Sequence, residues 1–415
     1  MCNSPDAKAA YLGLIADAAS YVSNYSSYLP AVTGTTSQAR TTSFSRHTAE
    51  SNISKEYGLA TSLTLYDFGQ REFKLEVAEY TLTAAGHSYN FNLQGMIETA
   101  LNGYYQLLTA QNAVTVSKES ERFAKESYDA AALQHKIGQV PLADELSAKS
   151  SYSSAILATE QAENQLQQAR ASLAVFMGIS AKTPVQVAEI DNKTLAHDPF
   201  NGKVEALMEE AKRKRADLLA SRAQLKGSEA SLRALERSDL ATISATANVD
   251  QSNINPYVFN RSASRSQAVG ISVSIPFFTG FSQTYSEMAS RKQLEAQRDE
   301  LDKSELGVEQ DVWNSWQNYD TAKRSWATSA DLMASAKQLK QVALGRYKEG
   351  LGTILDVLSA QSQYSSALQS QLQSRYSLLS ARVALVRAVG LLDLDTMQPE
   401  ASVKIAPVNV TISTN

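Results

Sequence analysis

Two proline-free intervals limit what this chain can fold into. No proline occurs from 31 to 140 or from 277 to 398, and both intervals are rich in Ala, Leu, Gln, Glu and Lys, residues with high helix propensity. Each interval predicts a continuous helix, over about 70–136 and about 281–348, that would be roughly 100 Å long at 1.5 Å per residue. An ordinary globular domain does not house such a helix.

The chain also repeats itself. The stretch AKSSYSSA at 148–155 returns as AQSQYSSA at 360–367, with six of eight positions identical at an offset of 212 residues. A period near 200 is too long for a solenoid repeat. The sequence therefore predicts two structural repeats, 1–200 and 201–415. The same offset pairs Gly138 with Gly350, Asp144 with Asp356, Leu173 with Leu385 and Gly178 with Gly390.

Each repeat is expected to begin with a hairpin of strands, over about 31–67 and about 240–277. In the second hairpin, Ile243 and Ile271 belong to two runs in which apolar residues alternate with Ser, Thr, Gly and Asn, the period of a strand with one apolar face. The polar, proline-containing stretch at 251–267 predicts a long loop between these two strands.

Helical hairpins follow the strands, over about 69–178 and about 280–390. Their turns are expected at HKIGQVPLADEL and YKEGLGTILDVL, where glycine interrupts the helical pattern. A proline-containing linker is expected from the end of the first hairpin to about 200. A further helix should open the second repeat, and a Pro-, Val- and Thr-rich tail should follow residue 390.

Several classes of protein are disfavoured by composition. The net charge of −4, with 39 Lys and Arg against 43 Asp and Glu, gives no basic footprint for nucleic acid. No apolar run reaches 18 residues, so no transmembrane helix is expected. Motifs for nucleophilic catalysis, phosphate binding and metal ligation are not evident, so neither an enzyme nor a cofactor is expected. The four histidines are dispersed at His47, His87, His135 and His197.

Alternating strands of about 10 residues can cross a membrane, but four strands cannot enclose a lumen, and an open sheet in lipid leaves unpaired edges. Several chains would have to build one barrel. With its duplicated halves, its strand hairpins before long helices, SIPFFTGF at a strand-to-helix junction and glycine-containing turns followed by Asp, the sequence resembles the outer-membrane efflux (TolC-like) family over nearly its full length.

This resemblance implies a mainly α fold with transmembrane β: long helical hairpins form a periplasmic tunnel, and a homotrimer shares a 12-stranded β-barrel with four strands per chain. It implies a channel in the outer membrane of a Gram-negative bacterium, in contact with outer-membrane lipid. Such a channel passively conducts substrates that an inner-membrane pump exports with a periplasmic adaptor protein, in multidrug efflux or type I protein secretion.

The same resemblance implies two kinds of site at the helix turns. The adaptor would dock on the tips, at Gly138, Gln139, Val140, Gly350, Leu351 and Gly352. The channel would narrow at Asp144, Asp356 and Tyr347, where threefold symmetry turns each aspartate into a ring of carboxylates that favours cations. A purely structural role is open for both aspartates, since Thr353 and Asp356 form a capping-box pattern and Asp144 lies in a first helical turn.

The chain departs from the family pattern at two positions near the second turn. Gly352 stands where a well-known relative has a basic link residue, and Ser359 stands where it has a second aspartate. Tyr347, with Lys136 or Lys348 as substitutes, would have to hold the closed state.

Two other classes of protein are alternatives to a channel. One is a non-membrane structural coiled-coil or filament protein with an exposed β-domain, and the other is a secreted enzyme. A filament has no need of amphipathic strands about 10 residues long, and an enzyme needs a convergence of polar residues that the sequence does not display. A detergent-dependent oligomer would favour the channel over both.

Overall fold

The computed structural model describes residues 5–45, 48–183, 185, 187, 200, 203–256 and 262–392. The chain divides into two compact units, each of which combines stretches from both halves of the sequence. One unit contains residues 1–8, 90–215 and 307–415, and the other contains residues 9–89 and 216–306. The division of the sequence into two structural repeats stays a prediction.

Two helices of 67 residues each confirm the prediction from proline-free composition. They are α2, Gln70–Lys136, and α7, Ser282–Lys348. With a four-stranded antiparallel sheet as the other main component, the fold is mainly helical, as expected. None of the helices in the described part of the chain is long and apolar enough to cross a membrane.

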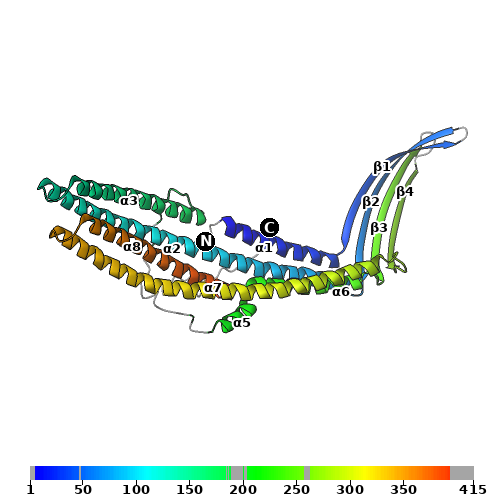
Figure 1. Ribbon diagram of the computed structural model, residues 1–415. Helices are drawn as coiled ribbons and strands as arrows, with labels where there is room; N and C mark the ends of the chain where they lie inside the picture. The colour runs from blue at the N-terminus through cyan, green and yellow to red at the C-terminus, as the bar shows by residue number, and fades with distance from the viewer. Residues whose placement is uncertain are drawn as a thin grey trace, which may run out of the picture. The chain divides into compact units, whose positions relative to one another are not determined.

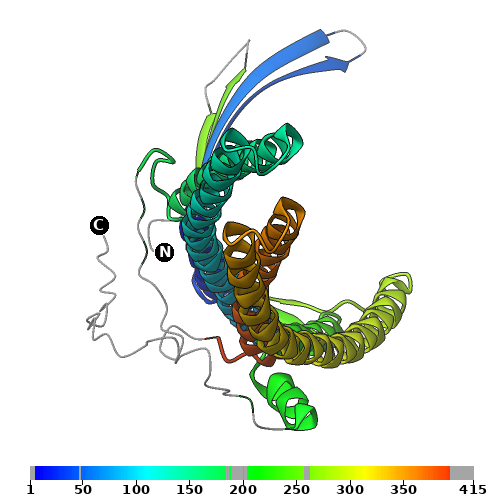
Figure 2. The same ribbon diagram turned by 60° about the vertical axis from the view of Figure 1, so that its left-hand side comes forward.

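The first unit is built from two helical hairpins. Helix α3, Leu142–Phe176, returns alongside α2, and helix α8, Ile354–Val389, returns alongside α7 (Figures 1 and 2). A short helix, α5, Val204–Lys214, also belongs to this unit. Apolar side chains hold the hairpins together in separate clusters along their length, among them Leu107 with Leu166 and Leu173, and Tyr364 with Ala336 and Leu368.

Gly390 ends α8 in a conformation and a contact that both require glycine. Its φ is +79°, its N–H donates to the Arg387 carbonyl at 2.8 Å, and the N–H of Leu391 donates to the Val386 carbonyl at 3.0 Å, the two bonds of a Schellman motif. A Cβ at Gly390 would lie 3.0 Å from the backbone nitrogen of Arg215. Helix α8 therefore ends directly against the end of α5.

Gly390→Ala is expected to lower the free energy of unfolding by about 2–5 kcal/mol. Left-handed φ costs an L-residue about 1–2 kcal/mol, and overpacking adds about 1–3 kcal/mol. Gly307→Ala is the matched control, because Gly307 lies within helix α7 and no atom would lie within 4 Å of its Cβ; alanine should raise stability there by up to about 1 kcal/mol. Denaturant unfolding measures both, and equal effects would contradict the assigned contact.

The second unit contains the sheet, with strands in the order β1-β2-β3-β4 (Figure 1). The strands are β1, Ala31–Ser45, β2, Thr48–Tyr66, β3, Thr242–Pro256, and β4, Ser262–Ser274. Each pairs antiparallel with the next, so β1 and β4 are edge strands within this chain. Helix α6, Ala216–Glu236, belongs to this unit, as does most of α1, Pro5–Tyr25, which a 3-10 turn, Ser26–Tyr28, follows.

The register of the sheet separates an apolar face from a polar one. Ile243 lies opposite Val273 and Ala245 lies opposite Ile271, whereas Ser244 lies opposite Ser272 on the other face. The apolar side chains on β4 are exposed, with Val269 at 88% and Ile271 at 72%. A soluble protein does not usually expose such a surface, and the part of the chain that the structure describes leaves this face uncovered.

The predicted loop at 251–267 is largely wrong. Strand β3 continues to Pro256, and β4 begins at Ser262, with Gln251 paired to Arg265 and Asn253 paired to Ala263. Strand pairing uses backbone N–H and C=O groups, so polar side chains do not end a ladder. The described strands therefore reach further than the apolar alternation does.

Exposed aromatic side chains gather where strands join helices. Phe68 precedes Gly69 just before α2, and Phe281 follows Gly280 just before α7; both have left-handed backbones, with φ of +54° and +62°. Their rings contact Tyr66 and Phe278 respectively, edge to face. Phe277 is 92% exposed beside them. These junctions present large apolar rings at one end of the sheet.

Two expected segments fall outside the described residues. Most of the predicted linker, at 184, 186 and 188–199, is not described, and the predicted tail is described only for Leu391 and Leu392. The expected helix at the start of the second repeat is present but interrupted, because Arg215 has an extended backbone, with ψ of 123°, at the end of α5.

Candidate functional site: the tips of the helical hairpins

The candidate site is formed by the two turns that reverse the hairpins, both in the first unit. At the α2–α3 turn Gly138 has φ of +76°, and at the α7–α8 turn Gly350 has φ of +72°. In each turn two backbone bonds close a Schellman motif: Gly138 donates to His135 and Gln139 to Gln134, both at 2.9 Å, and the matching pairs are Gly350 to Tyr347 and Leu351 to Arg346. The sequence expectation that these glycines end helices is confirmed.

In the first tip, His135 makes contacts across the turn between α2 and α3. His135 Nδ1 lies 3.0 Å from the carbonyl oxygen of Val140, and its Nε2 lies 3.9 Å from a carboxylate oxygen of Glu145. Pro141 precedes α3 and offers no side-chain cap. Asp144 lies in the first turn of α3, where the helix dipole favours a negative charge.

In the second tip, a capping box formed by Thr353 and Asp356 begins helix α8, as the sequence predicts. The Asp356 carboxylate accepts the Thr353 N–H at 3.0 Å and the Thr353 hydroxyl at 2.9 Å, and Thr353 Oγ1 accepts the Asp356 N–H at 3.2 Å. The backbone and side-chain bonds from Thr353 lower the pKa of Asp356 below its ordinary value, because they stabilise the charged carboxylate. The Asp356 side chain is nonetheless exposed.

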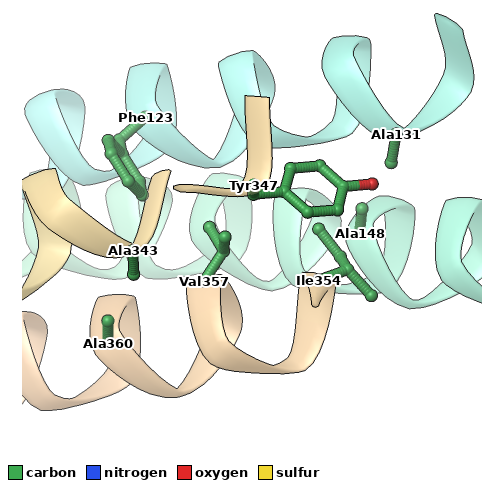
Figure 3. Close-up of a cluster of buried hydrophobic side chains, with 8 residues drawn as sticks. All are labelled: Phe123, Ala131, Ala148, Ala343, Tyr347, Ile354, Val357 and Ala360. Atoms are coloured by element: carbon green, nitrogen blue, oxygen red, sulfur yellow. The ribbon is translucent and has the colours of Figure 1, made fainter. Parts of the chain in front are cut away.

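Tyr347 differs from the two aspartates because it is buried beneath the tips. Its ring is 2% exposed and lies among side chains from all four helices of the two hairpins (Figure 3). The backbone carbonyl of Tyr347 accepts a bond of 3.2 Å from the Gln134 side chain of α2. These contacts tie α7 to α2. The cluster comprises Phe123, Ala131, Ala148, Ala343, Tyr347, Ile354, Val357 and Ala360.

The hydroxyl of Tyr347 is buried without a hydrogen-bond partner, and it is directed toward the part of the cluster where Ala131 and Ala148 lie (Figure 3). Burial raises the pKa of this phenol above its ordinary value, and the Asp144 carboxylate raises it further. Asp144 thus acts on the buried phenol electrostatically. A buried hydroxyl without a hydrogen-bond partner costs about 1–3 kcal/mol.

Lys340, which sequence reasoning missed, is a second polar group in this packing. Its ammonium lies 3.8 Å from the ring centroid of Tyr364, 4.5 Å from that of Phe123 and 3.9 Å from a carboxylate oxygen of Glu119. Burial lowers the pKa of Lys340, and Glu119 opposes that shift. Lysine is seldom buried without such partners, so this contact fixes α7 against α2 and α8.

Lys136 and Lys348, the substitutes expected to help close the tip, are exposed. Arg346, which sequence reasoning also missed, is the cation that bonds within the tip: its Nη2 donates to the Leu351 carbonyl at 3.1 Å. No local pattern signals this bond, since a helical arginine is usually read as solvated.

Large apolar side chains are exposed on both tips. Ile137 and Leu142 lie beside the first turn, and Leu351 and Leu355 lie beside the second, with Leu351 72% exposed. Exposed apolar residues around a polar turn are typical of a surface that binds another protein. Among the described residues, no three His, Cys, Asp or Glu side chains are grouped so as to hold a metal ion.

Each hairpin combines a 67-residue helix with a returning helix of 35 or 36 residues, and the sheet has an exposed apolar face. The chain belongs to the outer membrane efflux protein family, whose model matches residues 1–179 and 207–391. The chain is thus an outer-membrane protein.

Individual relatives and structures agree with this assignment. Protein CyaE of Bordetella pertussis is 26% identical over 408 residues, which cover 96% of this chain and 83% of CyaE. The toluene efflux pump outer membrane protein TtgC of Pseudomonas putida is 23% identical over 398 residues, covering 94% and 81%. A crystal structure of CusC, from work on folding and transmembrane channel formation, superposes with a TM-score of 0.80 at 18% identity, covering 94% of this chain and 90% of CusC.

Proposed function

We propose that this chain is one subunit of a trimeric outer-membrane channel-tunnel, which passively conducts substrates delivered by an inner-membrane pump and a periplasmic adaptor. The observation that carries the proposal is the four-stranded sheet: among the described residues, the edge strands β1 and β4 are each paired on one side only, and the apolar face of the sheet is exposed. Three such sheets joined edge to edge give 12 strands, enough for a barrel with an open lumen.

Two further features support a barrel in lipid. Apolar residues on β3 and β4 share one face and polar residues share the other, which is the pattern of a strand between lipid and an aqueous lumen. The exposed aromatic rings at the strand-to-helix junctions, including Phe277 and Phe278, suit the aromatic girdle at a membrane interface.

The first test is the size of the purified protein with and without detergent. A channel should be a single trimeric species in detergent and should aggregate when detergent is removed, because the lipid-facing surface is then exposed to water. A stable, detergent-free monomer or filament would contradict the proposal and would favour a structural coiled-coil protein.

We also propose that the channel narrows at the tips, where Asp144 and Asp356 would face the aperture and Tyr347 packs beneath them. Asp144 and Asp356 are charged groups in matching first helical turns, and Tyr347 lies in the cluster that packs the two hairpins together. A threefold axis beside the tips would turn each aspartate into a ring of carboxylates. Such a ring attracts cations and repels anions.

The double variant Asp144→Asn/Asp356→Asn is expected to lose cation selectivity and block by multivalent cations in planar bilayers. Removing six carboxylates from a trimer removes the field that attracts cations, and both substitutions keep the size of the side chains. Circular dichroism should show unchanged helix content. Unchanged selectivity in a folded double variant would leave both residues as helix-terminal groups only.

The tips are further proposed as the docking surface for the adaptor, through Gly138, Gln139 and Val140 on one turn and Gly350, Leu351 and Gly352 on the other. The exposed apolar side chains beside these turns support this role. The pump determines which substrate is exported, so the same tunnel could serve multidrug efflux or type I protein secretion.

A further inference from the structure

The matched tips differ in charge at one position close to the proposed aperture. In α7, Arg346 lies four residues before Gly350, and the matching position in α2 is Gln134. Gln134 is uncharged and donates to the Tyr347 carbonyl at 3.2 Å. The second tip therefore has a cation beside its aspartate that the first tip does not have at the matching position.

Arg346 is held in place at both ends. Its backbone carbonyl accepts the Leu351 N–H at 2.8 Å, and its guanidinium donates to the Leu351 carbonyl at 3.1 Å. Gly352 packs closely against the base of this side chain, because a Cβ there would lie 3.4 Å from Cβ of Arg346. The charge is thus fixed across the turn.

Arg346 and Asp356 also share one groove. This groove, of about 220 Å³, lies between α7 and α8 at the second tip. The residues that line it are Leu339, Val342, Ala343, Arg346, Gly352, Asp356, Ser359, Ala360 and Gln363. Arg346 and Asp356 are its two charged residues. The positive charge of Arg346 also lowers the pKa of Asp356, as the smallest of the causes after the two bonds from Thr353 and the opposing effect of desolvation.

The Asp356 carboxylate is also engaged by hydrogen bonds from Thr353. Its Oδ2 accepts both the Thr353 N–H and the Thr353 hydroxyl, so this oxygen is already bonded within the helix cap. A carboxylate bonded in this way and screened by a neighbouring guanidinium presents a weaker field to a passing ion than one beside an uncharged residue.

We propose that Arg346 is a selectivity-determining residue, which screens Asp356 so that Asp144 carries most of the cation preference of the aperture. The proposal rests on the proposed function, because it needs a channel that narrows at the tips. Under this proposal Asp144 and Asp356 contribute unequally to cation selectivity, although they occupy equivalent positions in the two halves of the sequence.

The test measures the K⁺/Cl⁻ permeability ratio of the purified full-length protein in planar bilayers, from the reversal potential in a KCl gradient. Arg346→Gln should raise this ratio roughly twofold, since one unscreened charge is added per subunit. In the Arg346→Gln/Asp356→Asn double variant the rise should disappear. Asp356→Asn alone should lower the ratio less than Asp144→Asn does.

Two controls separate charge from structure. Arg346→Lys keeps the charge but not the planar guanidinium, and it should hold the ratio near the wild-type value. Lys337→Gln removes one positive charge from an exposed position on the same helix that does not line the groove, and it should change the ratio less than Arg346→Gln.

The inference is overturned if Arg346→Gln leaves the ratio unchanged, if Lys337→Gln raises it equally, or if Asp356→Asn alone lowers it as much as Asp144→Asn. A wild-type protein that forms no conducting pores would instead contradict the proposed function. The two failures are therefore distinguishable.

Discussion

Gly138→Trp and Gly350→Trp are expected to abolish export while leaving the trimer assembled. At both glycines a Cβ would meet no atom within 4 Å, so a large side chain would project from the tip without clashing in this chain. The remaining folding cost is the left-handed φ, about 1–2 kcal/mol per substitution. Each tryptophan side chain would lie beside the exposed Ile137 or Leu351, on the proposed adaptor surface. There it would prevent the adaptor from approaching the turn closely.

Export is measured by complementation of a strain that lacks this chain, and assembly is measured by the size of the detergent-solubilised protein. Gly138→Asn and Gly350→Asn are the matched controls, because asparagine tolerates left-handed φ better than other non-glycine residues and is small. These variants should retain export. Normal export by the tryptophan variants, with trimers intact, would refute adaptor contact at the turns.

The long helices and their turns could be predicted because the signals are local. Proline-free composition and helix formers predict α2 and α7, and a glycine followed by a new helical pattern predicts a Schellman end. The capping box of Thr353 and Asp356 is likewise contained in four consecutive residues. Each of these structures depends on neighbours in the sequence, so no knowledge of tertiary packing is needed.

The strand ends could not be predicted from side-chain alternation. Residues 251–256 and 262–267 are polar, yet they pair as β3 and β4, because the ladder is made by backbone groups. Alternation reports where one face is apolar. It does not report where pairing stops.

The contacts around the tips were missed for a different reason. Lys340 is buried because Phe123 and Tyr364 come from two other helices, and Phe123 is more than 200 residues away in the sequence. The family resemblance places Tyr347 at the constriction, but the burial of Tyr347 depends on side chains of four helices. Arg346 folds onto the carbonyl of Leu351 only because the turn brings the two together. Such contacts are tertiary, and one sequence carries no local sign of them.

Ile271→Arg is expected to cost about 2–4 kcal/mol of folding free energy in a bilayer, whereas Ser272→Arg should be tolerated. The two residues are adjacent on β4, but the register places Ile271 on the apolar face and Ser272 on the polar face. If the apolar face meets lipid near mid-bilayer, an arginine there must be moved out of water. An arginine at position 272 would remain in the aqueous lumen.

The same contrast can be made on the neighbouring strand, where Ile243 and Ser244 occupy the corresponding faces of β3. Folding free energy is measured by denaturant titration in lipid vesicles, and the amount of trimer in the outer membrane gives a second readout. A soluble sandwich would also penalise Ile271→Arg, but it would fold without vesicles, whereas a barrel should need them. Equal tolerance of arginine at positions 271 and 272 would mean that neither face of the sheet meets lipid. The sheet would then no longer support the proposed channel.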